Sequence, residues 1–468
     1  MTRAQSRLAV FALAAVLASA IAYDIWRTPI QVWDAIEEML DAQRSPSVAA
    51  SFQSAVGTTA YLRPLRIAQI KALFDAAHGR YWLAYRGFHA ALLVALVLLF
   101  ASALRVESGR DAAAAAFALM VLTGLHTFLG FLREAFPINH FLEIAVFTLV
   151  ALNLSLSRGG WWADLLAGVT LVCATLTLES GVLVWVVIVA AWIAGARGVS
   201  TRGVALVTAL LVGYFALRFA YLRTGLPGLE ERASGFLLDR LSAHDLQQRF
   251  GASPLLFYLY NVGASLLTVL AGEPRDGQFV AVRAWLQRDV RAVTWLALAT
   301  SVGTTMLLAW WVVTAWRRRV SGHGERLALV AAAVIAANAV LSFSYVKDDI
   351  VAVAGVFYAL ATYAAVRGVL GVIPAARPAL GVAGCVVVAV LACGWAVRSS
   401  GVHYVVSTHA FRIRNDWVRA PLALQEQGRT PAGADARALI DDLRGLALDA
   451  DVPNPLLAPD WKERWFGN

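Results

Sequence analysis

Four acidic side chains lie close together shortly after the first apolar stretch of the chain. Glu37, Glu38 and Asp41 follow Asp34 at spacings of three, four and seven residues, which places the carboxylates near one stripe of a helix. A carboxylate beside a membrane-facing cavity can serve as a general base, so Asp34 is a candidate catalytic residue, although composition does not choose between it and Asp24. The same stripe also suits the solvated face of an amphipathic surface helix, and both interpretations stay open.

A second group of polar residues is basic. It comprises the stretch Tyr61–Arg66, the pair Phe88-His89 at the head of an apolar run, and Lys347 at the start of a polar turn. A guanidinium group at headgroup depth can pair with a phosphate through two parallel hydrogen bonds. The candidates for binding a phosphate or a substrate are therefore Arg63, Arg66, His89 and Lys347. Ordinary interfacial anchoring of tyrosine and arginine is the alternative, and Asp348 could neutralise Lys347.

Ionisable residues at the ends of apolar runs form a third group. Such residues are costly near hydrocarbon and usually line a polar cavity. The candidates for a polar cavity are His126, Glu134, His140, Glu143 and Glu179. Glu143 and Glu179 stand out because each has apolar neighbours on at least one side. A purely structural ion pair, such as Glu134 with Arg133, is the competing interpretation.

The elements that must position these residues are membrane helices. Of the 468 residues, 59% are hydrophobic and 15% are charged, and the mean hydropathy is +0.64. Runs such as Phe88–Ala103 and Val204–Tyr221 approach the length that crosses a hydrocarbon core, and they lack the alternation of a transmembrane barrel. We therefore expect an all-α polytopic membrane protein with about eleven transmembrane helices, within a range of about 10 to 13.

Charge in the short loops predicts the topology. The net charge of +9 comes from arginines between the apolar runs, as the positive-inside rule requires, and gives no reason to expect a nucleic-acid partner. On this basis Arg105, Arg158 and Arg197 mark the cytosolic side, and the three polar groups face outward. The first apolar stretch resembles a secretory signal, with Ala18-Ser19-Ala20 as a cleavage site, but we favour an uncleaved first helix.

Four regions follow from this topology. They are a core module over residues 1–222 with a structured outer loop at 23–86, a second outer loop over 223–292, transmembrane helices over 293–397, and an outer tail over 398–468 with one convincing helix, Ala434–Leu448. Leu255–Ala271 is expected to be re-entrant or interfacial, because a full crossing would place Arg317–Arg319 on the outer side.

Several kinds of chemistry have no signature in the sequence. The three cysteines lie in apolar runs without metal-binding spacing. A phosphate-cradling glycine loop, a His-Glu-x-x-His motif and a Cys-x-x-Cys motif are all missing, which argues against nucleotide hydrolysis. We expect no required cofactor; a divalent metal stays open but has no support in the sequence.

The order of the polar motifs resembles that of the membrane glycosyltransferases of the GT-C fold, most closely their protein O-mannosyltransferase-type and lipid-donor branches. The resemblance covers residues 1–222, and its motifs here are Asp34, Tyr61-Leu62-Arg63-Pro64-Leu65, Arg86-Gly87-Phe88-His89, His126 and Leu178-Glu179-Ser180-Gly181. Two positions depart from the family pattern: the doubled acid of the family is the single Asp34, and the lysine of its turn is Leu178.

The resemblance implies a transferase that moves a sugar from a polyprenyl-phosphate donor to an envelope acceptor, which is a glycan, a lipid or a protein. Asp34 would be the general base or would orient the acceptor. The expected location is a bacterial inner membrane, with the active site facing outward. Two alternatives stay open: a transporter or flippase of a lipid-linked or other amphipathic solute, and a noncatalytic scaffold in envelope assembly.

Overall fold

The protein is described by a computed structural model. The residues that it describes are 2–57, 61–133, 137–224, 228–318, 322–372, 378–426, 433–457 and 459–466. Glu134, one of the predicted cavity residues, lies outside these ranges, as do Arg319 and Arg377.

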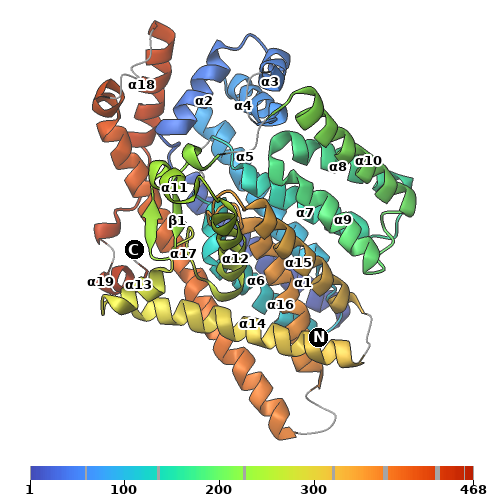
Figure 1. Cartoon of the computed structure of the whole chain (residues 1–468). Coiled ribbons are helices and arrows are strands. Elements are labelled where there is room, and N and C mark those ends of the chain that lie inside the picture. The colour runs from blue at the N-terminus through green and yellow to red at the C-terminus, as the bar shows by residue number, and fades with distance from the viewer. Residues whose placement is uncertain are drawn as a thin grey trace.

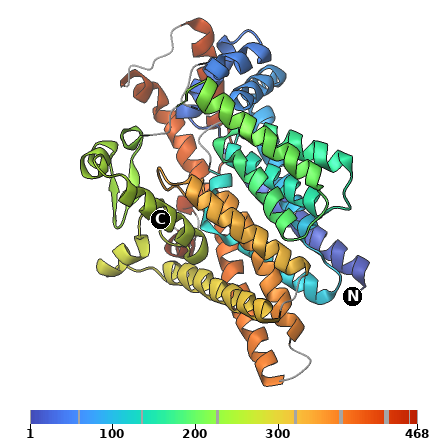
Figure 2. The same cartoon turned by 45° about the vertical axis from the view of Figure 1, so that its right-hand side comes forward.

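Helices make up nearly all of the described structure (Figures 1 and 2). The elements of the first half are α1 (Arg3–Trp26), α2 (Trp33–Arg44), α3 (Val48–Gly57), α4 (Pro64–Ala77), α5 (Tyr81–Ala103), α6 (Gly109–Gly124), η1 (His126–Phe131), α7 (His140–Leu156), α8 (Trp161–Thr177), η2 (Glu179–Val182), α9 (Leu183–Ile193), α10 (Thr201–Phe215) and its π-helical continuation η3 (Ala216–Tyr221).

The second half adds the remaining helices and one small hairpin. Its elements are η4 (Leu229–Glu231), β1 (Ser234–Phe236), β2 (Asp239–Leu241), α11 (Ala243–Phe250), α12 (Leu255–Ala271), α13 (Val280–Leu286), α14 (Ala292–Arg318), α15 (His323–Leu341), α16 (Ala352–Val372), α17 (Pro378–Glu426), α18 (Ala434–Leu448), η5 (Pro455–Leu457) and α19 (Asp460–Phe466). The antiparallel pair β1–β2 is the one departure from the predicted all-α fold among the described residues.

Seven helices of the described chain are long and apolar enough to cross a membrane: α1, α5, α10 with η3, α14, α15, α16 and α17. Four shorter apolar helices, α7, α8, α9 and α12, accompany them. Exposed apolar side chains such as Leu206, Val212, Trp310 and Val390 cover outward surfaces, as expected where lipid replaces water. A multi-pass helical membrane protein is therefore supported, while the predicted number of crossings stays a prediction.

The bundle is organised around α16, which packs against α6, α14 and α15. Of the apolar stretch of this helix, 83% is buried. At one end of α16, Arg367 donates a 2.6 Å hydrogen bond to Asp111. Asp111 also closes the capping box of α6, because its carboxylate accepts the Ser108 backbone amide. We call this the basic end, since Arg7, Arg105 and other cations line a cavity there.

The opposite end, which we call the loop end, carries α2, α3 and α4 beside α18 (Figure 1). The segment between α1 and α5, predicted from the sequence to be a structured loop, forms the helices α2, α3 and α4. Pro64 opens α4 at a position that needs no backbone donor, and the Tyr85 hydroxyl donates to the Ile70 carbonyl at 2.9 Å. These contacts fix α4 on the start of α5.

The apolar stretch Ala112–Leu129 is divided between two elements, α6 and η1. Gly124, the last residue of α6, lies against Trp395, and a Cβ at this position would be 3.0 Å from the ring. The tail does not hold a single helix, because α17 continues from the apolar region past residue 398 to Glu426. The predicted Ala434–Leu448 helix is confirmed as α18.

The segment Leu255–Ala271 forms α12, with the bounds that the apolar run predicted. After α12 the chain turns back along it, since the Tyr260 hydroxyl donates to the Gly277 carbonyl at 2.6 Å. Asp276 and Asp348 then exchange hydrogen bonds of 2.9 Å, each carboxylate accepting the other residue's backbone amide. The connection that follows α12 thus contacts the loop between α15 and α16. The depth of α12 in a bilayer stays a prediction.

The turn η2 requires a glycine at position 181. A Cβ on Gly181 would lie 2.2 Å from the Ala174 carbonyl carbon. This is a clash with the backbone, and no side-chain rotamer relieves it. We expect Gly181→Ala to lower the melting temperature of the purified protein by about 5 °C or more. Gly213→Ala is the matched control, because nothing lies within 4 Å of its Cβ. Equal melting temperatures for the two variants would contradict this packing.

Candidate functional site

A pocket at the loop end joins segments that are far apart in the sequence. Its polar lining residues include Tyr61, Arg63, Glu179, Arg218, Arg232 and Tyr345, and its volume is about 260 Å³. They come from the segment before α4, from η2, from η3, from the connection to β1 and from the loop between α15 and α16. We call it the Glu179 pocket.

A forked ion pair forms the floor of the Glu179 pocket. Arg63 donates from Nε to both Glu179 oxygens, at 3.1 and 3.0 Å, and from Nη2 to one of them at 2.6 Å. Arg218 lies 3.8 Å from the same carboxylate and donates to the Tyr214 hydroxyl at 3.2 Å. Arg232 also lines the pocket, so arginines outnumber Glu179, the one carboxylate among the lining residues that the structure describes.

The remaining wall of the Glu179 pocket is apolar. It is lined by Phe141, Phe215, Phe219, Leu341 and Phe343. Phe215 and Phe219 are 39% and 41% exposed, so this wall continues onto the outward surface of α10 and η3. A pocket with cations on one side and aromatic rings on the other suits a ligand with an anionic head and an apolar tail.

The acidic stripe of α2 lies beside this pocket without lining it. Glu38 forms an ion pair with Arg66, and burial raises the pKa of Glu38 against the opposing effect of Arg66. Asp34 is exposed one helical turn before Glu38, and its negative charge also raises the pKa of Glu38. Among the described residues Asp34 has no hydrogen-bond partner, so its carboxylate is open to an incoming molecule.

Three predicted residues are engaged in structural contacts. His140 and Glu143 are buried together at the start of α7, with Nδ1 and Oε2 2.9 Å apart. His89 is buried with its Nε2 2.6 Å from the Phe131 carbonyl oxygen. It lines neither the Glu179 pocket nor the cavity described next, so the binding role predicted for His89 has no support in this geometry.

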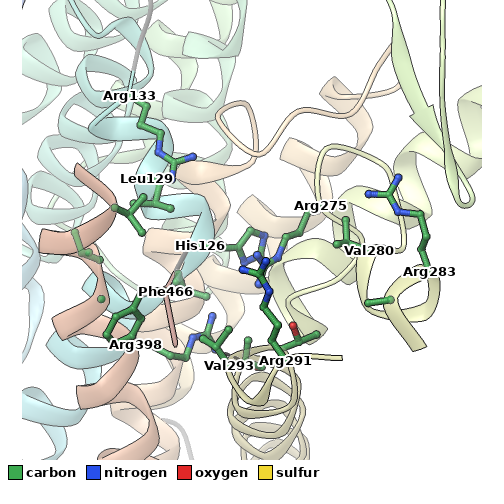
Figure 3. A pocket seen from close by; sticks show the side chains of 18 of the residues that line it. His126, Leu129, Arg133, Arg275, Val280, Arg283, Arg291, Val293, Arg398 and Phe466 are labelled. Carbon is green, nitrogen blue, oxygen red and sulfur yellow. Dashed lines mark hydrogen bonds between the residues drawn. The ribbon is translucent and has the colours of Figure 1, made fainter. Parts of the chain in front are cut away.

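His126 lies in a second and larger cavity, of about 520 Å³, between η1, α13, α14 and α17. Figure 3 shows arginine side chains around its imidazole ring. The arginines that line the cavity are Arg133, Arg275, Arg283, Arg291 and Arg398, and we call it the arginine cavity.

The loop between α15 and α16 borders both cavities. Tyr345 lines the Glu179 pocket, and an Asp348 oxygen lies 3.7 Å from His126 Nε2. Lys347 lines neither cavity and forms a 2.5 Å ion pair with Asp349. The positive charge of Lys347 is therefore neutralised by Asp349, and not by Asp348 as the sequence suggested. Burial and the Asp276 carboxylate raise the pKa of Asp348.

The sequence missed most of the arginines in both cavities. Arg218 had a usable signal, because an arginine near the end of an apolar run is costly unless it has a partner. Arg232, Arg275 and Arg283 look like ordinary loop residues in the sequence, and only the fold brings them to cavities. No group of three or more His, Cys, Asp or Glu side chains in the described structure is arranged to hold a metal ion.

Comparison with known proteins gives no relative. No protein-family model, no curated protein and no solved structure matches the chain.

The Arg63–Glu179 pair should be energetically coupled. Both side chains are about one-fifth exposed, at 22% and 23%, so removing one partner leaves a partly buried charge at a cost of about 1–3 kcal/mol. We expect Arg63→Ala and Glu179→Ala each to lower the unfolding free energy, and the double variant to lose less than the sum by about 1 kcal/mol. Unfolding in SDS measures this cycle.

The matched control is the Asp41–Arg44 pair on α2, whose side chains are 72% and 63% exposed. Its coupling should stay below about 0.5 kcal/mol. Additive losses at Arg63 and Glu179 would contradict the pairing.

Asp348 should make stability depend on pH. A carboxyl whose pKa is raised on folding holds its proton more tightly in the folded state, so stability decreases as the pH rises from its ordinary pKa through the raised one. Asp348→Asn removes this charge and keeps an acceptor for the Asp276 amide. Relative to wild type, the variant should gain melting temperature, on the order of 2 °C, between about pH 5 and pH 8. Asp349→Asn, which loses the Lys347 pair, should show no such gain.

Proposed function

We propose that this chain is a membrane glycosyltransferase that moves a sugar from a polyprenyl-phosphate donor to an acceptor of the cell envelope. The observation that carries the proposal is the Glu179 pocket, where Arg63, Arg218 and Arg232 face an aromatic wall that continues onto the outward surface of η3. Such a pocket offers cations to a phosphate and apolar surface to the chain attached to it.

The proposed reaction requires charge at two places. The acceptor hydroxyl attacks the anomeric carbon of the sugar, the bond from that carbon to the phosphate oxygen breaks, and the bond electrons leave with the phosphate. Arg63 is already engaged in the ion pair with Glu179. We therefore assign the stabilisation of this developing negative charge to Arg218 and Arg232, which also line the pocket. The proton of the acceptor hydroxyl needs a base.

Asp34 is the base that we propose. Its carboxylate is exposed on α2, the helix that Glu38 and Arg66 hold against α4. Asp34 does not line the Glu179 pocket, so the acceptor has to extend from Asp34 to the sugar held at this pocket. The reaction therefore takes place at the loop end. We assign this end to the outer face of a bacterial inner membrane, because the short connections between apolar helices at the other end carry Arg105 and Arg197.

The test is glycan and lipid-linked-sugar profiling of membranes from cells that lack this protein. Wild type should restore a missing sugar, whereas Asp34→Asn should reduce the product by about a hundredfold or more, since a general base contributes on that scale. Asp41→Asn is the matched control, because Asp41 is a more distant carboxylate of α2 already paired with Arg44, and it should retain product within about twofold of wild type.

Insertion and melting temperature are measured for both variants, so that loss of product is not confused with loss of protein. Restoration by Asp34→Asn to the wild-type level would remove this residue from the mechanism. An unchanged sugar profile in cells lacking the protein would overturn the transferase proposal and favour transport or scaffolding.

A further inference from the structure

Arginines outnumber carboxylates among the described lining residues of the arginine cavity. Five arginines line it, and Asp289 is the one carboxylate of this described lining. Two further carboxylates lie nearby: Glu273 pairs with Arg275 at 3.7 Å, and an Asp348 oxygen is 3.7 Å from His126. Cations crowded together in a partly enclosed space repel one another, and a multiply charged anion would relieve this repulsion.

His126 is a buried polar group without a hydrogen bond in the described structure. Its side chain is only 8% exposed, and neither ring nitrogen has a hydrogen-bond partner. The ring lines the cavity, and Figure 3 shows Arg275 and Arg291 reaching toward it. A buried imidazole without a hydrogen bond is costly, so the ring is placed to bond a ligand in the cavity.

One cation of the arginine cavity, Arg398, is held in place by the fold. Arg398 of α17 donates from Nη1 to Ala297, Thr300 and Ser301 of α14, at 3.1, 2.8 and 2.9 Å. The same guanidinium lies over the ring of Trp395, 4.0 Å from its centroid. Arg398 therefore needs no movement to face a ligand.

The start of α14 adds to the positive potential. This helix begins at Ala292 and is 27 residues long, and residues of its first turns, Val293 and Thr294, line the cavity. The N-terminal end of a long helix carries partial positive charge and is a common location for bound phosphate groups.

We propose that the arginine cavity binds a multiply charged phosphate group of the diphosphate type, separate from the ligand of the Glu179 pocket. A diphosphate group is large enough and carries enough charge to bind several guanidinium groups at once. A ligand with a single carboxylate is not. The group is supplied either by a soluble molecule or by the head of a lipid, because Leu129, Val405 and Phe466 give the cavity an apolar side. This inference does not depend on the proposed transferase activity.

Calorimetric titration of the purified full chain, in nanodiscs of neutral lipid, with inorganic pyrophosphate tests the soluble source. Saturable binding should be at least tenfold tighter than that of sulfate and should weaken as salt increases. Arg275→Gln combined with Arg291→Gln should weaken it at least tenfold. Arg249→Gln is the matched control, because Arg249 is an exposed arginine on α11 that does not line the cavity.

The lipid source is tested by capture of a long-chain isoprenyl diphosphate, a lipid whose head is a diphosphate group, from mixed nanodiscs containing excess neutral lipid. Retention of this lipid by wild type and by Arg249→Gln, with loss in the double variant, would identify a lipid head as the ligand. Melting temperatures of all variants show that they fold. The proposal is overturned if neither probe binds, or if the double variant and Arg249→Gln bind both probes as wild type does.

Discussion

The ion pair between Arg63 and Glu179 determines how the loop end is assembled. Glu179 lies between two apolar helices, where a carboxylate without a partner would be too costly to keep. Arg63 reaches it from the residue before α4, so the pair docks the helices between α1 and α5 onto the turn between α8 and α9. Arg66, one turn along α4, then holds α2 through Glu38. The positions of the pocket and of Asp34 both depend on this chain of contacts.

Patterns within short stretches of sequence predicted the helices and turns. The contacts between those elements depend on residues that are far apart in the sequence. Apolar periodicity was enough for the helices between α1 and α5 and for α18, and the change of pattern around Glu179 was enough for the turn η2. The contact of Gly124, the last residue of α6, with Trp395 was not predictable, because Trp395 is distant in the sequence. Arg63 and Glu179 were named separately, but their pairing across more than a hundred residues had no local signal.

The loop between α15 and α16 connects the two cavities physically. Asn338 fixes it from within the bundle, since its side chain donates to the Ile350 carbonyl and accepts the Ala354 amide, both at 3.0 Å. Tyr345 and Asp348 therefore sit on one short, anchored segment, each at a different cavity. A displacement of this segment would alter both cavities together, whatever their ligands are.

The length of α17 has a consequence for access to α2. At about 1.5 Å per residue its 49 residues extend for about 74 Å, more than twice the thickness of a hydrocarbon core. Trp417 of its distal part is buried with Ile36 of α2 and Leu443 of α18 in one small apolar core. The distal part of α17 thus extends far enough to pack, together with α18, on the buried face of α2. Asp34 lies on the other, exposed face of the same helix, so a molecule can approach it without displacing α17.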